Sequence, residues 1–370
     1  MFKDLKGIEK GREEKERDEG KKFKLLTKIK NQMIKKYIDP KYWGGEGQLN
    51  DQIYPSMYAE LESKILRDVE LTKGDIINYV MQNLNDKALA DAWINYIHGM
   101  YTGCLLELLT RRNQKQNKRT QIYLNGMGKT FFGLFYNARQ VDELILENFS
   151  GTYAGMNIAS EEGSKANTLI ALNMRCFNVF QQAGNNRGEI GLIIMKDIDG
   201  NSTGKYIGTA RIYPEKQNIE LVIGMNLTGE WALKQANADT IIAKNIKGLL
   251  ALNNARGARL ISAQDLYREH IDDNAIIADF GSAEHSTLRN AYSKKLLYDN
   301  VQDKYAYYTP TGEIICRKKS PEEYEKNMKE YKIRELIELA ESLEDKSPGK
   351  MFETAQKIKE TYDSVKEKIE

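Results

Sequence analysis

The sequence predicts a mainly β fold, in which short parallel strands stack on one another between two helical ends. Two repeats between residues 125 and 300 predict the strands, one centred on an Asn or Asp and the other ending in an Ala. Outside that region, apolar residues recur with the spacing of helices, which predicts the helical ends.

The first repeat is an Asn or Asp with an aliphatic residue four positions earlier and an apolar residue one position later. The polar positions are Asn148, Asn173, Asp197, Asn226, Asn245 and Asp265. The aliphatic positions are Leu144, Leu169, Ile193, Val222, Ile241 and Ile261. We expect two ladders, an aliphatic one inside and a polar one at a corner, because Asn side chains stack as amide ladders and tolerate positive φ.

The second repeat has the form apolar-x-polar-Ala and precedes most of the polar positions. Its copies are residues 135–138, 180–183, 233–236, 252–255 and 288–291. The units vary in length while the two short pieces persist, so insertions fall in turns. Such units bury their apolar faces only against their neighbours.

Together the repeats predict a parallel β-helix over residues 120–303. A leucine-rich repeat is the alternative, but its Asn falls one residue later and its units include segments that the connections here do not match. In overall pattern the region resembles the pectate-lyase-like β-helix proteins. The resemblance is one of fold, covers about half of the chain and implies a right-handed coil, a handedness that the residues alone do not give.

The flanking segments are expected to cover the ends of this region. Residues 1–20 are rich in charge and predict a flexible arm, and residues 21–115 carry helical patterns that predict an N-terminal cap. Residues 304–319 predict a closing hairpin. Residues 320–370 predict a helical hairpin, whose last helix has apolar residues at alternating steps of three and four. We expect this seam to pair within the chain, with self-association as the alternative.

Composition favours no charged polymer as a general partner, because the formal net charge is only +2. The three cysteines form no pattern, and the Lys- and Glu-rich N-terminus has no apolar leader, so we expect a cytoplasmic protein. The most apolar run, residues 97–109, is too short to span a membrane. The glycines of residues 42–55 and 124–130 do not match a nucleotide-binding motif, and no cofactor or metal is predicted.

The richest cluster of acid–base groups lies in residues 268–285, inside the longest unit. Its candidate catalytic residues are Asp272, Asp273, Asp279 and His285. The β-helix enzymes that this region resembles place carboxylates on one face to cleave acidic polysaccharides, which would be their role here. The alternative is a polar surface insertion.

Two basic segments are candidates for binding phosphates, residues 21–36 and 111–119. In the second, the candidate residues are Arg111, Arg112, Lys115, Lys118 and Arg119. The alternative for each segment is a solvated surface. Tyr42 and Trp43 either hold their loop on the core or offer a stacking surface.

These observations favour a non-enzymatic scaffold or interaction protein, which presents a stacked surface to a protein partner or to copies of itself. One alternative is a carbohydrate-active lyase or hydrolase with its site in residues 268–285. A second alternative is nucleic-acid binding through residues 21–36 and 111–119.

Overall fold

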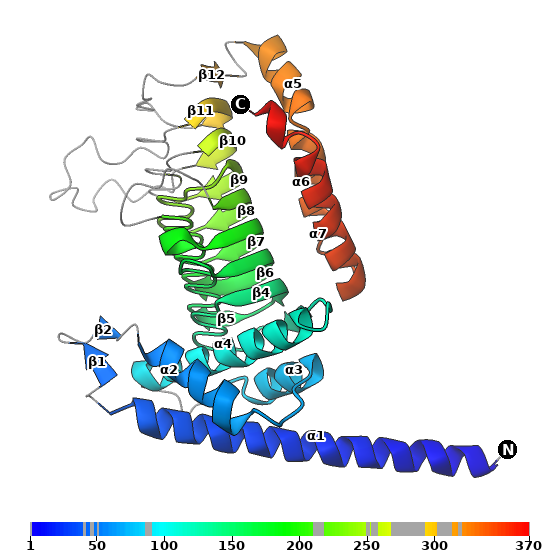
Figure 1. Cartoon of the computed structure of the whole chain (residues 1–370). Coiled ribbons are helices and arrows are strands. Elements are labelled where there is room, and N and C mark those ends of the chain that lie inside the picture. Colours follow the sequence, from blue (N-terminus) through cyan, green and yellow to red (C-terminus); the bar gives the residue numbers. More distant parts are fainter. Residues whose placement is uncertain are drawn as a thin grey trace.

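The computed structural model describes most of the chain (Figure 1). The backbone is described for residues 2–39, 42–44, 48–49, 52–85, 91–209, 218–248, 252, 258–267, 293–301, 313–316 and 320–369. Side chains are described for the same residues except 2–19, 43–44, 48–49, 265–267, 293–301 and 313–316.

One parallel sheet forms the centre of the molecule. Its strands are β3 (Gln121–Asn125), β4 (Gln140–Glu147), β5 (Ser150–Thr152), β6 (Lys165–Phe177), β7 (Glu189–Asp199), β8 (Ile219–Thr228), β9 (Thr240–Lys247), β10 (Ala258–Tyr267), β11 (Ser293–Val301) and β12 (Glu313–Cys316). Apart from β5, which pairs with β6, neighbours in the sheet follow the order of the sequence from β3 to β12. β12 pairs with β11 in parallel, so it extends this sheet, whereas residues 304–312 and 317–319 of the expected closing hairpin lie outside the described residues.

The predicted aliphatic ladder is confirmed. In consecutive strand pairs the matched residues are Leu144, Leu169, Ile193, Val222, Ile241 and Ile261. All six side chains are fully buried. A one-residue shift in any pair would place residues of the opposite face in this ladder, so the aliphatic positions and the Asn or Asp positions that follow them share one register.

The polar positions form a second ladder at the ends of the same strands. Positive φ values, between 51° and 54°, occur at Asn148, Asn173, Asp197, Asn226 and Asn245. The side-chain amide of Asn226 donates to Asp197 Oδ1 at 2.6 Å, and that of Asn245 donates to Asn226 Oδ1 at 2.8 Å. Asn148 donates in the same way to Asn125 at 3.3 Å. Asn148, Asn226 and Asn245 therefore each turn their own chain and donate to the adjacent rung.

The predicted fold class is wrong. Helices make up about 40% of the chain and strands about 25%, so the protein has an α/β fold and is not mainly β. All described strands that line the core belong to this one sheet, which lies on one side of the core. A parallel β-helix would require strands on the remaining sides as well.

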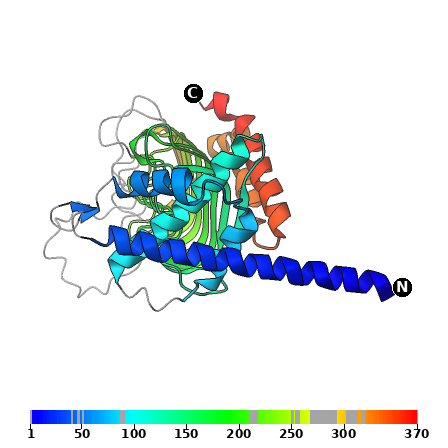
Figure 2. The same cartoon turned by 60° about the horizontal axis from the view of Figure 1, so that its bottom comes forward.

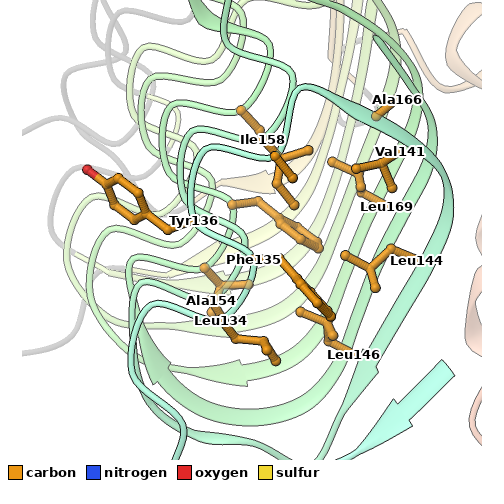
Figure 3. Close-up of a cluster of buried hydrophobic side chains, with 14 of the residues drawn as sticks. Leu134, Phe135, Tyr136, Val141, Leu144, Leu146, Ala154, Ile158, Ala166 and Leu169 are labelled. Atoms are coloured by element: carbon orange, nitrogen blue, oxygen red, sulfur yellow. The ribbon is translucent and has the colours of Figure 1, made fainter. Parts of the chain in front are cut away.

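Left-handed turns explain why the opposite side is not a sheet. In the segment after β5, φ is positive at Tyr153, Gly155, Asn157 and Ala159, alternating with residues of negative φ. Alternate left-handed residues cannot continue an extended strand. Equivalent segments follow β3, β6, β7 and β8. Figure 3 shows apolar side chains of the segments after β3 and β5, among them Phe135 and Ile158, meeting strand residues such as Leu144 and Leu169.

The second repeat reflects how these turn segments pack. Backbone hydrogen bonds align one position of each segment with its neighbour's, and this position holds Phe135, Gly155, Phe180, Gly204 and Leu233. A Cβ on Gly155 would lie 2.5 Å from the Phe180 ring, so a large residue at this position in one turn segment requires glycine at the same position in the neighbouring segment. Three positions later, the same five segments hold Ala138, Ile158, Ala183, Ile207 and Ala236. The Ile side chains restore the volume that glycine leaves, because core packing tolerates few voids.

A helical layer covers the β3 end of the sheet (Figures 1 and 2). It comprises α1 (Phe2–Tyr37), the short strands β1 (Trp43–Gly44) and β2 (Gln48–Leu49), α2 (Ile53–Glu60), the π-helix η3 (Leu61–Ile65), α3 (Lys73–Gln82) and α4 (Ala92–Gln114). α4 lies directly on the first turn segment: a Cβ on Gly99 or Gly103 would lie 2.2 or 2.4 Å from the carbonyl oxygen of Gly133 or Tyr136.

The charged N-terminal segment, for which the sequence predicts a flexible arm, is helical. α1 begins at Phe2, and its first half extends beyond the rest of the molecule in Figure 2. Lys, Glu and Arg are good helix formers, and opposite charges four residues apart, such as Glu13 and Arg17, favour a helix. The segment therefore forms a helix without an apolar stripe.

The C-terminal helices cover the outer face of the sheet (Figure 1). They are α5 (Pro321–Glu330), α6 (Ile333–Glu341), α7 (Pro348–Asp363) and the 3₁₀ turn η6 (Lys366–Lys368); a further 3₁₀ turn, η5 (Asn185–Arg187), precedes β7. The first expected helix is split between α5 and α6, where Lys332 has a φ of 52°. The apolar seam of the last helix is buried against the sheet and α6, at Met351, Ala355, Ile358, Tyr362, Val365 and Ile369.

Polar contacts fix these helices on the sheet. Lys196 of β7 is almost fully buried and pairs with Glu344 at 2.6 Å. The Tyr362 hydroxyl donates to Asp239 Oδ2 at 2.6 Å, and Arg259 pairs with the same carboxylate. Within the described part of the chain, no helix has the length and apolar character needed to cross a membrane.

Candidate anion-binding groove

A groove of about 570 Å³ lies where the helical layer meets the sheet. One wall is the loop between η3 and α3, and the other is the end of α4 with the turn into β3. Its charged lining residues are Arg67, Asp68, Glu70, Lys73, Arg112, Lys118 and Arg119. Three of these belong to the basic segment 111–119.

Arg112 fixes the first wall. Its guanidinium donates to the carbonyl oxygens of Leu66 at 2.5 Å and Val69 at 2.7 Å. The loop then ends at Thr72, which caps α3 through a reciprocal pair of hydrogen bonds with Asp75. Arg112 is therefore mainly a support for the loop, because its donors are used by backbone acceptors.

Asp142 and Asn113 fix the second wall. The Thr120 backbone N–H donates to Asp142 Oδ2 at 2.8 Å, and Gln114 donates to the other oxygen of this buried carboxylate at 2.8 Å. Asn113 donates to the Thr120 hydroxyl at 3.0 Å, and Asn117 turns the chain with a φ of 55°. Lys118 and Arg119 are thereby held beside the groove on a rigid turn.

The groove carries an excess of positive charge. Five cationic side chains line it against two carboxylates, which leaves three positive charges. The Arg119 side chain is 71% exposed, and its ion pair with Glu143 is long, at 3.5 Å. A pair of this length with a largely exposed cation is weak. The Arg119 guanidinium therefore remains able to bind a competing anion.

The remaining predicted cations lie elsewhere. Arg111 pairs with the buried Glu107 at 2.8 Å and lies over the Tyr58 ring, so it belongs to the packing of α2 on α4. Lys115 is exposed at the end of α4 and does not line the groove. In the basic segment 21–36, Lys22 pairs with Asp75 and Lys36 with Glu60, which neutralises part of its charge.

The buried ionisable groups of the helical layer are used in packing. Glu107 accepts hydrogen bonds from the Tyr54 hydroxyl at 2.8 Å and the Arg139 backbone N–H at 3.0 Å. His98 Nε2 lies 2.9 Å from the Tyr79 hydroxyl, and burial lowers the pKa of His98 to about 3. Burial also raises the pKa of the Cys104 thiol well above its ordinary value. Burial keeps His98 and Cys104 uncharged, Glu107 is paired with Arg111, and none of the three lines the groove.

Several candidates lie outside the described residues. They are the catalytic candidates Asp272, Asp273, Asp279 and His285, together with the side chains of Trp43 and Asp265. Tyr42 packs on Tyr37 with ring centroids 5.1 Å apart, which places it on the core surface. Among the side chains that are described, no group of three or more His, Cys, Asp or Glu residues is placed to hold a metal ion.

Arg67 and Lys73 are groove residues that the sequence does not single out. They lie more than forty positions before Lys118, and each is an isolated cation near acidic neighbours. Only the packing of the η3–α3 loop against the end of α4 brings them beside the basic segment. No family model, curated protein or solved structure matches this chain.

Proposed function

We propose that the chain is a non-enzymatic interaction protein whose groove binds an acidic segment of a partner protein. The observation that carries the proposal is the excess of three positive charges held on two rigid walls. Internal hydrogen bonds hold the backbone of both walls, so the segments that carry these cations need little ordering on binding, and more of the electrostatic attraction contributes to affinity.

The other lining residues support a peptide as the ligand. Asn113 and Gln116 offer amide groups that bond backbone donors and acceptors, and Val69, Leu71 and Leu109 offer an apolar floor. The groove has the volume of sites that enclose a few residues of a ligand. No aromatic side chain lines it for stacking of bases, which favours an acidic peptide over single-stranded nucleic acid.

The proposal is tested by titrating the full chain with a fluorescent poly-glutamate 20-mer and with a dT20 oligonucleotide. We expect the peptide to bind more tightly, with an affinity that falls as salt is raised. The variant R67A/K73A/K118A/R119A should bind the peptide roughly tenfold more weakly or worse.

A matched control removes four exposed cations from the C-terminal helices, in the variant K326A/K329A/K350A/K357A. It changes the net charge equally and should bind the peptide as the native chain does. Equal losses in both variants would show a response to net charge alone and contradict the groove. Tighter binding of dT20, lost in the groove variant, would establish nucleic acid as the ligand instead.

A further inference from the structure

α1 lies along the base of the molecule, at the edge of the helical layer. In Figure 1 the other described helices and the sheet lie above it, and in Figure 2 it crosses the molecule in front of them. Its second half packs on this layer through a stripe that includes Leu26, Ile29 and Met33, each 2% exposed. The side of α1 opposite this stripe therefore faces away from the protein.

Lysines occupy this opposite side, which we call the outer face of α1. They are Lys21, Lys24, Lys28 and Lys35, and their steps of three, four and seven residues keep them on one side of a helix. All four are exposed, and none forms an ion pair with a described carboxylate. The outer face therefore carries four positive charges that the packing of the described chain does not use.

Other lysines of α1 hold the helix in place. Lys22 pairs with Asp75 of α3 at 3.3 Å, and Lys36 pairs with Glu60 of α2 at 2.6 Å. Lys30 is buried and donates to Asn83 at 3.3 Å. The fold thus separates two sets of lysines, one used in packing and one left at the surface.

The row of cations continues in the first half of α1. Steps of seven residues from Lys24 toward the N-terminus reach three further cations, Arg17, Lys10 and Lys3. The same steps from Lys21 reach Glu14, which is the one acid in either row. At about 100° per residue, the seven cations fall within about 60° of arc. Because α1 is helical from Phe2, the row is about 50 Å long at 1.5 Å per residue.

Apolar groups border the lysines. A shallow groove of about 510 Å³ runs along the outer face between Phe23 and Lys35. Leu25 and Ile38 are 37% and 36% exposed. Lysine stems can lie over apolar surface of this kind while their ammonium groups reach a polar boundary. The outer face therefore combines a row of charge with a thin apolar border.

We infer that the outer face of α1 binds an anionic lipid surface. Each Lys or Arg close to a layer of acidic headgroups strengthens binding about fivefold. A lipid surface is flat on this scale, so a straight row of cations meets it along its whole length. Since α1 lies at the base, the other described elements are on its far side and leave this approach open.

A nucleic-acid duplex fits the outer face less well. Its phosphates wind around the axis with a turn of about 34 Å, so a straight row meets them only where a strand crosses it. A helix that reads bases enters the major groove, whereas the second half of α1 is packed along one side on the helical layer. These features favour a flat anionic surface.

The inference goes beyond the proposed function. The groove lies between the η3–α3 loop and the end of α4, and none of its lining residues belongs to α1. A chain with both sites would bind an acidic protein segment while attached to a lipid surface. Each site can be removed without altering the residues of the other.

The test measures binding of the full chain to sedimented vesicles, made of phosphatidylcholine alone or with about a third phosphatidylserine. We expect the chain to bind the anionic vesicles, and the neutral vesicles at least roughly tenfold more weakly. The variant K21Q/K24Q/K28Q/K35Q should bind the anionic vesicles at least roughly tenfold more weakly than the native chain. Raising the salt from about 0.1 M to about 1 M should release the native chain, because the Debye length falls to about 3 Å.

Two matched variants control for net charge and for folding. K326Q/K329Q/K350Q/K357Q removes four exposed lysines from the C-terminal helices and should bind the anionic vesicles as the native chain does. K21R/K24R/K28R/K35R keeps the charge of the outer face and should also bind normally. Gln, Arg and Lys have similar helix propensities, so circular dichroism should show the same helix content in every variant.

Five outcomes would overturn the inference. Three concern lipid: equal binding to both kinds of vesicle, no binding to either, or equal losses in the two glutamine variants. The fourth is tighter binding to a short DNA duplex that depends on the same four lysines. The fifth is a native mass in light scattering that falls in K21Q/K24Q/K28Q/K35Q, which would assign the outer face to a second copy of the chain.

The two proposals fail independently. The groove variant R67A/K73A/K118A/R119A should bind anionic vesicles as the native chain does, and K21Q/K24Q/K28Q/K35Q should retain its affinity for poly-glutamate. A chain that binds vesicles but not poly-glutamate would contradict the groove alone, and the reverse result would contradict the lipid site alone.

Discussion

The two faces of the parallel sheet are closed in different ways. The inner face, with Leu169 and Ile193, packs on turn segments that directly follow its own strands. The outer face, with Ile170 and Ile194, packs on helices that lie more than a hundred residues further along the chain. Closure of the inner face is therefore local and repeated, whereas closure of the outer face is a single docking event fixed by a few polar contacts.

The largest expected effect comes from breaking the inner packing. Phe180 is fully buried between rows that hold Gly155 and Gly204, so Phe180→Ala should leave a cavity that its neighbours cannot fill. We expect a loss of about 3–5 kcal/mol in the free energy of unfolding, measured by urea denaturation. Phe177→Ala, at a side chain that is 49% exposed, serves as the control. Similar losses in both variants would contradict the alternating packing.

Weakening the outer cover should act more locally. Ile358 of α7 is fully buried, and Ile358→Ala should destabilise the docked helices by about 2–4 kcal/mol. Because these helices form a separate layer, amide hydrogen exchange should rise in residues 321–363 more than in β6 to β8. Uniform exchange across the molecule would instead show that the layers unfold as one unit.

The close approach of α4 to the first turn segment gives a third comparison. Gly103→Ala would place a Cβ 2.4 Å from the Tyr136 carbonyl oxygen and should destabilise the chain by about 1–3 kcal/mol. Gly74→Ala, near the start of α3, meets only the Thr72 hydroxyl at 3.7 Å and should be neutral or slightly stabilising. Thermal denaturation of both variants measures the difference in stability. Equal midpoints would contradict the close contact between α4 and the first turn segment.

The smallest expected effect is a pH dependence at the helical end. Burial lowers the pKa of His98 to about 3, below its ordinary value near 6.5, so the unfolded chain binds a proton more readily. Stability from this group is complete above pH 6.5 and falls as pH drops toward 3, by at most about 1.4 kcal/mol per pH unit. Urea denaturation at pH 7 and 5 should show a smaller difference for His98→Gln than for the native chain. An unchanged difference would rule out His98 as the source.

Much of the sheet could be predicted from the sequence because strand register depends on a short repeat. The spacing from Leu144 to Asn148 recurs in every clear unit, and the structure pairs these aliphatic positions rung by rung. The fold class could not be predicted from that repeat. A residue in a left-handed turn, such as Asn157, and a residue in an extended strand give similar patterns of polar and apolar residues in a sequence. The repeat therefore predicts strands where the structure has left-handed turns.

The groove was only partly predictable for a related reason. Lys118 and Arg119 stand in a visible basic run, but Arg67 and Lys73 carry no local signal. Arg112 is part of the same run, yet its guanidinium is used by backbone carbonyls of the opposite wall. Charge along a sequence does not indicate which cations remain available after packing.

The sequence by itself determined the ladders, because rung-to-rung contacts depend on residues a fixed distance apart in consecutive units. Only the tertiary structure decided what covers each face of the sheet: left-handed turn segments pack on the inner face, and helices remote in the sequence pack on the outer face. It also brought Arg67 into the same groove as Arg119. This arrangement depends on long-range packing, which joins segments whose separation in the chain carries no periodic signal.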